Sequence, residues 1–296
     1  MKHNLSDKWV TIDPETTATR DLHQFILSSV SPRPIAFAST IDDNGVQNLA
    51  PYSFFNAFSS NPPILVFSSN RRVENNTTKD TLHNIMQNKE VVINVVNYDM
   101  VQAMSMTSIE FAANVSEFDT CGFTPIPSDL VKPMRVAESP VNIECKVTEI
   151  IPLGKEGGAG HLILCNVVKM HINEAVLKGG DKVRIDPFKL DSVSRLGGLY
   201  YCRVNAPNIF EINQDIKTLP IGYNALPEGI RNSNVLTAND IAKMAGLAEL
   251  PSIEEVANAA IGRFKTRDEA HAEAKDLILQ TNLRGASALL WAAEKL

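Results

Sequence analysis

The sequence of 296 residues lacks any apolar run long enough to cross a membrane, which takes roughly 18 residues in a helix. Its longest apolar stretches are short segments such as Pro62–Phe67 and Val91–Val96, and residues 1–20 are mostly polar. It also lacks blocks of like charge, and its net charge of −6 does not favour nucleic acid or an anionic membrane. These absences predict a cytoplasmic protein with neither a membrane nor a nucleic-acid partner.

Cysteine is scarce, and its spacing argues against two further kinds of site. The only cysteines are Cys121, Cys145, Cys165 and Cys202, with no CxxC pair and no histidine nearby at zinc-ligand spacing. A structural zinc site and a redox-active dithiol both need such spacing. We therefore expect buried, free thiols.

Signatures of a catalytic nucleophile or a metal centre are also absent from the sequence. No GxSxG motif occurs, and no pair among His83, His161 and His171 stands at ligand spacing with a carboxylate. The segment Gly154–Gly160 has neither the GKS/T ending nor the GxGxxG spacing of a phosphate loop, so a hairpin loop is favoured. We predict no metal site and name no catalytic residue.

Runs of β-branched and aromatic residues, bounded by proline, glycine and asparagine, fill the first two thirds of the chain and are typical of strands. Helical patterns interrupt them only at Asp21–Ser28, Thr78–Asn88 and Tyr98–Ala112, too few for a doubly wound parallel sheet. The sequence therefore predicts a mainly β fold, an antiparallel barrel with covering helices. The expected strands are Pro34–Thr40, Ile64–Ser69, Val91–Asn97, Val141–Ile151, His161–Ile172, Leu199–Val204 and Asn208–Ile212.

The last third of the chain is rich in alanine and in helix-start patterns. We expect three or four amphipathic helices there, forming a helical C-terminal extension over residues 213–296 beside a barrel domain over residues 1–212. The segment Asn213–Asn234, with two prolines and two glycines, is the natural linker or wrapping arm. The pairs with capping-box spacing are Thr237 with Asp240, Ser252 with Glu255, and Thr266 with Glu269.

A cationic and hydroxyl-rich segment, Ser68–Thr81, is the first candidate binding element. It contains Arg71, Arg72 and Lys79, and its Thr-Lys-Asp-Thr run opens a predicted helix. Backbone N–H groups at a helix N-terminus, a fixed cation and hydroxyl donors suit a phosphate monoester. The alternative, from residue types alone, is a solvated loop followed by an ordinary helix cap.

An aromatic segment, Asn48–Phe58, is the second candidate. It combines three phenylalanines, a tyrosine and a proline with short polar side chains. Apolar and aromatic walls with a few placed polar groups suit a flat heterocycle. Ordinary barrel core with a turn explains the same residues, and both interpretations stay open at this point.

Taken in order along residues 20–212, seven segments resemble the flavin reductase-like proteins of the FMN-binding split-barrel superfamily. Their order is more specific than any one of them. The segments are SPRPIAFAST (31–40), NLAPYSFFNAFSSNPP (48–63), KDTLHNI (79–85), VVINVV (91–96), ESPVNIEC (138–145), GHLILCNVVKMHI (160–172) and RLGGLYY (195–201).

The resemblance implies a six-stranded Greek-key split β-barrel that dimerises, with FMN at the subunit interface and NADH or NADPH as reductant. The positions it assigns to the flavin ring and ribityl chain are Ser39, Thr40, Asn48, Ala50, Ser53 and Phe54. Those it assigns to the phosphate are Ser69, Arg71, Lys79 and Thr81, which agrees with the anion-binding interpretation of that loop.

His161 matches a histidine that lies near the nicotinamide in the family's better-known reductases, but Gly160 replaces the usual aspartate before it. We therefore expect either a nicotinamide contact or a histidine that is solvated or at the edge of the core. The flavin carries the redox chemistry and the protein positions it. The expected activity is an FMN-dependent NAD(P)H oxidoreductase; the alternative is an FMN-binding, flavoredoxin-like electron carrier reduced by a protein partner.

Overall fold

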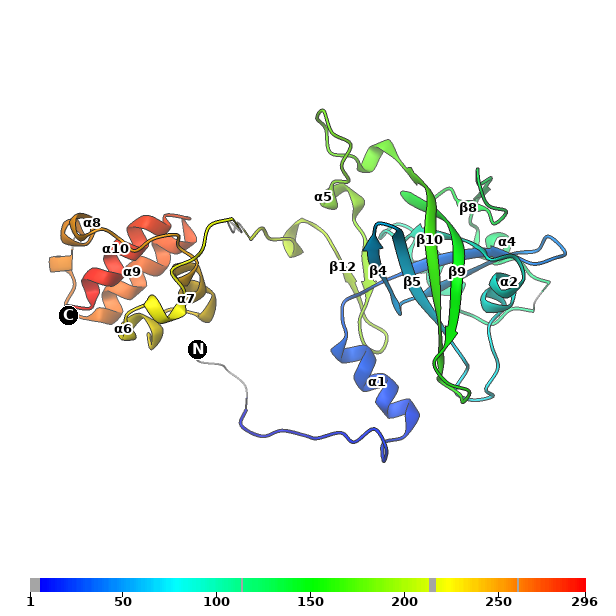
Figure 1. Ribbon diagram of the computed structural model, residues 1–296, viewed down its shortest axis with the longest axis horizontal. Coiled ribbons are helices and arrows are strands. Elements are labelled where there is room, and N and C mark those ends of the chain that lie inside the picture. Colours follow the sequence, from blue (N-terminus) through cyan, green and yellow to red (C-terminus); the bar gives the residue numbers. More distant parts are fainter. Residues whose placement is uncertain (1–5, 113, 213–216, 260) are drawn as a thin grey trace. The chain divides into compact units, whose positions relative to one another are not determined.

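The computed structural model describes residues 6–112, 114–212, 217–259 and 261–296, and the chain divides into two compact units (Figure 1). Residues 12–210 form a unit built on a β-sheet, called the barrel unit. Residues 211–296, grouped with the residues before Ile12, form the helical unit. The expected boundary between residues 212 and 213 falls beside residues 213–216, which lie outside the described residues. No helix in the described part of the chain is long and apolar enough to span a membrane.

A seven-stranded sheet organises the barrel unit, in the order β3-β2-β6-β9-β10-β5-β4. Neighbouring strands are antiparallel throughout, which confirms the predicted mainly antiparallel β fold. The resemblance implied six strands, whereas this sheet has seven, with β3 and β4 as its edge strands. The strands are β2 (Ala36–Ile41), β3 (Gln47–Tyr52), β4 (Phe55–Ser60), β5 (Pro63–Asn70), β6 (Glu90–Val95), β9 (Val141–Pro152) and β10 (Gly160–Ile172).

Strand β2 is buried on both of its faces. Ala36 and Ala38 belong to one core with Phe67, whereas Phe37 packs into a second core with Leu49. Successive side chains of a strand point to opposite faces, and a strand covered on both faces is apolar throughout. Neighbouring residues along β2 therefore serve different cores, which decides below which site residues can meet.

Smaller elements complete the barrel unit. A three-stranded sheet joins β1 (Arg33–Pro34), β11 (Val193–Arg195) and β12 (Tyr201–Arg203), and β7 (Pro125–Ile126) pairs with β8 (Arg135–Val136). Helix α1 (Thr19–Ser29) contains no buried residue, so it depends on contacts beyond its end for its position. The other helices are α2 (Asp80–Asn88), α3 (Val101–Met106), α4 (Glu117–Cys121) and α5 (Pro187–Leu190).

Some expected elements differ from the structure for local reasons. The helix expected over Tyr98–Ala112 is only α3, because turns follow Met106. The strand expected over Asn208–Ile212 was wrong: Ala206–Asn208 is a 3₁₀ turn and the residues after it are irregular. Strand β3 was not predicted because Pro51 interrupts its pattern, but β3 is an edge strand and tolerates a proline there.

The helical unit has its own apolar core, which contains Ile230, Met244, Ala274 and Leu290. Two of the three expected capping boxes are complete, at Thr237 and Ser252. The helices are α6 (Glu228–Arg231), α7 (Ala238–Ala245), α8 (Ile253–Asn258), α9 (Arg267–Leu279) and α10 (Leu283–Ala293).

The third expected box forms only by half. Thr266 accepts the N–H of Glu269, as the spacing predicts, but the Glu269 carboxylate turns to the N–H of Lys265 at 2.7 Å. The capping spacing therefore located the helix start correctly in all three cases, whereas the reciprocal bond formed in two of them.

Glu255 joins α8 to α10 and gives the helical unit an acid-sensitive link. Its carboxylate pairs with the Arg284 guanidinium at 2.6 and 2.8 Å and accepts the N–H of Ser252 at 2.7 Å. The Arg284 bond and then the Ser252 bonds lower the pKa of Glu255 from 4.5 to about 2. A carboxyl whose pKa is lowered on folding stabilises above its unfolded value and loses that effect as pH falls through the folded value.

We expect Glu255→Gln to lower the melting temperature at neutral pH, and the difference from wild type to disappear between pH 4.5 and about 2. Thermal unfolding followed by far-UV circular dichroism across that range measures it. The matched control is Glu254→Gln on the exposed first turn of the same helix, which should be neutral. A constant difference between the Glu255 variant and wild type at every pH would contradict the assignment.

Candidate functional site

Four polar side chains from β3, β5 and the start of α2 lie together, and we call them the anion cluster: Tyr52, Ser69, Lys79 and Thr81. The ammonium of Lys79 lies over the ring of Tyr52, 5.1 Å from its centroid. Burial raises the pKa of Tyr52 to about 12, although the nearby hydroxyls of Thr81 and Ser69 act in the opposite direction. Tyr52 is therefore a neutral hydrogen-bond donor at physiological pH.

The polar atoms of the anion cluster are incompletely satisfied within the described residues. The Tyr52 phenol and the Ser69 Oγ are buried and have no hydrogen-bond partner there. Leaving a buried donor unpaired costs free energy, so such atoms mark a place where a ligand completes the structure.

The Lys79 ammonium, the cation of the cluster, is also available to bind an anion. No carboxylate of the described residues forms a salt bridge with Lys79, whose pKa is lowered by burial and then by Arg72. Lys79 is the N-cap of α2, and no side chain caps that helix. Helix N–H groups, two free hydroxyls and a cation together fit a phosphate.

Arg71, the fourth residue expected at the phosphate, is used to fold its own loop. Its Nε and Nη2 donate to the side chain and backbone oxygens of Asn76. The loop is also tied to the β9–β10 hairpin, because the N–H of Gly158 donates to Arg71 O at 3.0 Å and Asn76 donates to Lys155 O at 3.1 Å. Arg71 therefore shapes the wall beside Ser69.

Asn48 adjoins the anion cluster, but its side-chain amide forms hydrogen bonds with other side chains of the protein. Its Oδ1 accepts the hydroxyl of Thr81 at 2.7 Å and that of Thr40 at 3.3 Å, while Nδ2 donates to the Glu117 carboxylate at 3.1 and 3.2 Å. Asn84 of α2 completes the network by donating to Thr40 Oγ1 at 3.1 Å. The amide of Asn48 thus positions Thr81. Thr40 is linked to the cluster through its hydrogen bond to Asn48.

Strand alternation separates two of the expected flavin residues. Ala50 lies on the same face as Asn48 and Tyr52, at the edge of the first core. Ser39 points to the other face of β2, where its hydroxyl donates to the carbonyl of Met134. The structure therefore brings Ala50 towards the cluster and leaves Ser39 outside it.

Ser53 and Phe54 lie at a second location, beside α1. Ser53 Oγ accepts from Nε of Arg33 at 3.4 Å, and the ring of Phe54 meets that of His23 with centroids 6.1 Å apart. Arg33 also donates to the carbonyls of Leu27, Val30 and Leu196, so one buried guanidinium joins α1, the β11–β12 hairpin and Ser53.

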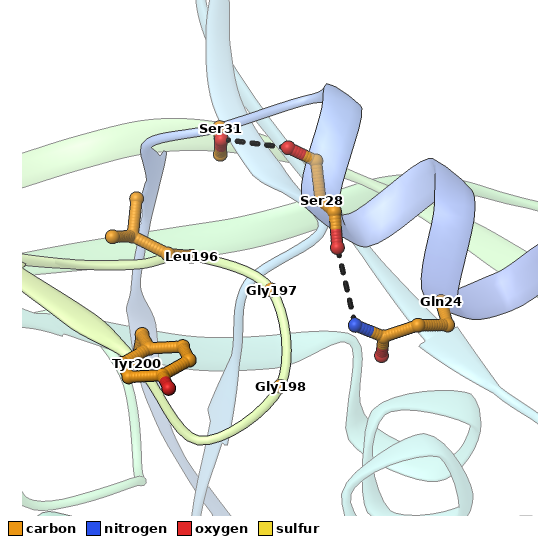
Figure 2. Close-up of a pocket in the computed structure, with 7 residues that line it drawn as sticks. All are labelled: Gln24, Ser28, Ser31, Leu196, Gly197, Gly198 and Tyr200. Atoms are coloured by element: carbon orange, nitrogen blue, oxygen red, sulfur yellow. Dashed lines mark hydrogen bonds between the residues drawn. The ribbon is translucent and has the colours of Figure 1, made fainter.

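A cavity of about 350 Å³ opens between α1 and that hairpin (Figure 2). Gln24, Ser28 and Ser31 line one side, with Gln24 donating to Ser28 Oγ at 3.1 Å, and Leu196, Gly197, Gly198 and Tyr200 line the other. Gly197 must be glycine because a Cβ there would lie 2.2 Å from Ser28 Oγ. None of the expected flavin residues lines this cavity.

His161 stands behind the anion cluster. It pairs with Ser69 across β10 and β5, it is only 6% exposed, and its Nδ1 donates to the Ser69 carbonyl at 3.1 Å. A ring fixed to the backbone of Ser69 favours a role in positioning that residue over a nicotinamide contact.

Glu117 is a residue that no sequence pattern indicated. It is 6% exposed, accepts the N–H of Leu49 at 2.9 Å together with the amide of Asn48, and has its pKa raised by burial. It lines a cavity of about 290 Å³ with three further carboxylates, those of Asp42, Asp43 and Asp80. Four carboxylates make that cavity unsuitable for phosphate.

His171 has carboxylate neighbours that its sequence spacing did not reveal. Its Nε2 lies 2.6 Å from Oε1 of Glu144, on the adjacent strand, and possible ligand atoms of Asp129, Glu144 and His171 lie within 4.8 Å of one another. Glu144 already accepts the N–H groups of Asp129 and Leu130 at 2.8 and 2.6 Å. The arrangement anchors residues 129 and 130 to the sheet.

The barrel unit is an antiparallel β-sheet fold in which buried hydroxyls and a lysine lie together at the N-terminus of α2. Residues 27–203 match the flavin reductase-like domain family, and the chain belongs to this family. It is thereby a flavin-related oxidoreductase, as the order of its motifs predicted. The match ends before the helical unit.

Similar proteins cover the same region. An uncharacterised protein of Aquifex aeolicus is 35% identical over 182 residues, which are 62% of this chain and 89% of that protein. Nitrilotriacetate monooxygenase component B from Bacillus cereus superposes with a TM-score of 0.65 at 31% identity, covering 70% of this chain and all of the other. The Pseudomonas fluorescens 2-nitrobenzoate 2-nitroreductase NbaA gives 0.63 at 27% identity, covering 72% of this chain and all of that one.

Proposed function

We propose that the protein is a cytoplasmic, homodimeric, FMN-dependent NAD(P)H oxidoreductase. The observation that carries this proposal is the anion cluster, which supplies a cation, two unpaired buried hydroxyls and an uncapped helix N-terminus in a chain of the flavin reductase-like family. A phosphate-bearing flavin needs those groups, and riboflavin does not. The flavin, when bound, supplies the hydride and electron-transfer chemistry.

The residues of this chain would bind and orient that cofactor. Lys79 and Ser69 would hold the phosphate, with Thr81 kept in place by Asn48. Ala50, Ser53 and Phe54, which follow Asn48 along β3 and its end, would face the ring system, while His161 fixes the backbone at Ser69. Ser39 has no part in this assignment because its side chain faces the other core.

A homodimer is supported by the distribution of exposed apolar side chains. On the barrel unit they include Phe25 and Ile26 of α1, Phe58 of the β4 edge strand at 69% exposed, and Leu199 and Tyr200 of the β11–β12 hairpin. Exposed apolar groups and an unpaired strand edge both favour association. The substrate that accepts the electrons stays outside this proposal.

Anaerobic mixing tests the proposed activity. Purified protein loaded with FMN should lose its visible flavin absorbance on addition of NADH or NADPH and regain it when air is admitted. Protein that retains FMN but is reduced only by a low-potential protein donor would instead be an electron carrier. Failure to retain FMN, riboflavin or FAD at all would reject both activities.

A further inference from the structure

The phenol of Tyr52 has no assigned role, although it is a buried polar group of the anion cluster. Tyr52 is 5% exposed, and its ring packs against that of Phe67 with centroids 5.1 Å apart. Its hydroxyl nevertheless has no hydrogen-bond partner within the described part of the chain. A phenylalanine would fill the same core position without leaving a donor unpaired, so packing does not explain the hydroxyl.

We propose that the Tyr52 hydroxyl donates a hydrogen bond to the terminal phosphate of the cofactor and, with Ser69, selects a phosphomonoester. The inference rests on the proposed function and adds to it a residue and a specificity. Ser69 Oγ is the second unpaired buried hydroxyl of the cluster; it lies near the Tyr52 phenol, and the ammonium of Lys79 lies over the ring of that tyrosine.

The remaining residues of the cluster explain why these two donors are needed. The Thr81 hydroxyl donates its proton to Asn48, and the Arg71 guanidinium donates to Asn76. Neither the hydroxyl proton of Thr81 nor these N–H groups of Arg71 are therefore free to bind a phosphate. A dianion would then have the Lys79 ammonium and the N-terminus of α2, with Tyr52 and Ser69 as the unused side-chain hydroxyl donors. Because the phenol titrates only near pH 12, it keeps its proton for donation at physiological pH.

Burial of these hydroxyls also restricts which anion can use them. Neither atom is exposed to solvent, and the ammonium of Lys79 lies over the Tyr52 ring. In this proposal Lys79 moves from the Tyr52 ring to pair with the incoming phosphate, and that movement gives the phosphate access to both hydroxyls. A buried pair of donors suits a group at the end of a ligand, as in FMN, and disfavours the internal diphosphate of FAD.

The test is calorimetric titration of full-length wild type and Tyr52→Phe with FMN, riboflavin and FAD, alongside the melting temperature of each unliganded protein. Wild type should bind FMN more tightly than riboflavin or FAD. The variant should bind FMN about ten-fold more weakly or worse, since a hydrogen bond to a charged group is lost, and bind riboflavin unchanged. Its unliganded melting temperature should be unchanged or higher, because an unpaired buried hydroxyl is removed.

Three results would overturn the inference while leaving the proposed function in place: equal FMN affinity in both proteins, an equal loss of FMN and riboflavin affinity, or equal binding of FMN and FAD by wild type. Wild type that binds no flavin would reject the proposed function itself. Tyr98→Phe, a tyrosine 47% exposed and stacked on Arg203, is the matched control and should leave all three affinities unchanged.

Discussion

Replacing Lys79 by methionine should weaken FMN binding about 100-fold and leave riboflavin binding unchanged. The substitution keeps the length and apolar body of the side chain and removes only its charge. A hydrogen bond to a charged group contributes about 1.5–3 kcal/mol, and about 1.4 kcal/mol corresponds to a ten-fold change in affinity. The upper part of that range applies because Lys79 is partly buried and no carboxylate of the described residues pairs with it.

The same lysine should give FMN binding a pH dependence. Burial and Arg72 lower its pKa, so in wild type the affinity should begin to fall at a lower alkaline pH than an ordinary lysine would produce, and the variant should lack that dependence. Fluorescence titration of FMN and riboflavin between neutral and alkaline pH measures both effects. Lys243→Met in the helical unit changes the net charge equally and serves as control. Equal loss of both flavins would place Lys79 away from the phosphate.

The helix start at the proposed phosphate site could be predicted from sequence because its residues are close together in the chain. Lys79 and Thr81 open α2, and a helix N-terminus with a neighbouring cation has a physical meaning that needs no tertiary information. Residue type alone could not say which side chains are free. Arg71 was expected to be a phosphate ligand, but its guanidinium donates to Asn76, five residues later. The loop conformation that brings these two residues together cannot be predicted from their spacing.

Strand alternation was the sequence signal that could have improved the flavin assignments. Ser39 and Thr40 are adjacent on β2, so at most one of them can face the cluster, and the structure places Ser39 in the other core. The same rule puts Tyr52 on the face of Asn48 and Ala50, four and two residues earlier. Glu117 lies 68 residues from the N–H of Leu49 that it accepts, and no local pattern could have located it.

Replacing Arg33 by methionine should destabilise the barrel unit by about 3 kcal/mol and release α1. The guanidinium is 4% exposed and donates to three backbone carbonyls: that of Val30 at 2.7 Å, that of Leu196 at 2.9 Å and that of Leu27. Charge-assisted bonds of this kind contribute about 1.5–3 kcal/mol each, and the carbonyls at the end of α1 recover part of the loss by binding water. Because α1 has no buried residue, it has little else to hold it.

Amide hydrogen exchange distinguishes this local effect from general unfolding. In Arg33→Met, the amides of residues 19–30 and 196–200 should exchange much faster, while those of β9 and β10 in the centre of the sheet stay protected. Arg20→Met, an exposed arginine on α1 itself, is the matched control and should behave as wild type. Slow exchange in α1 of the Arg33 variant would show that apolar contacts hold the helix. Fast exchange would mean that one buried cation shapes the cavity between α1 and the hairpin, and with it the position of Ser53.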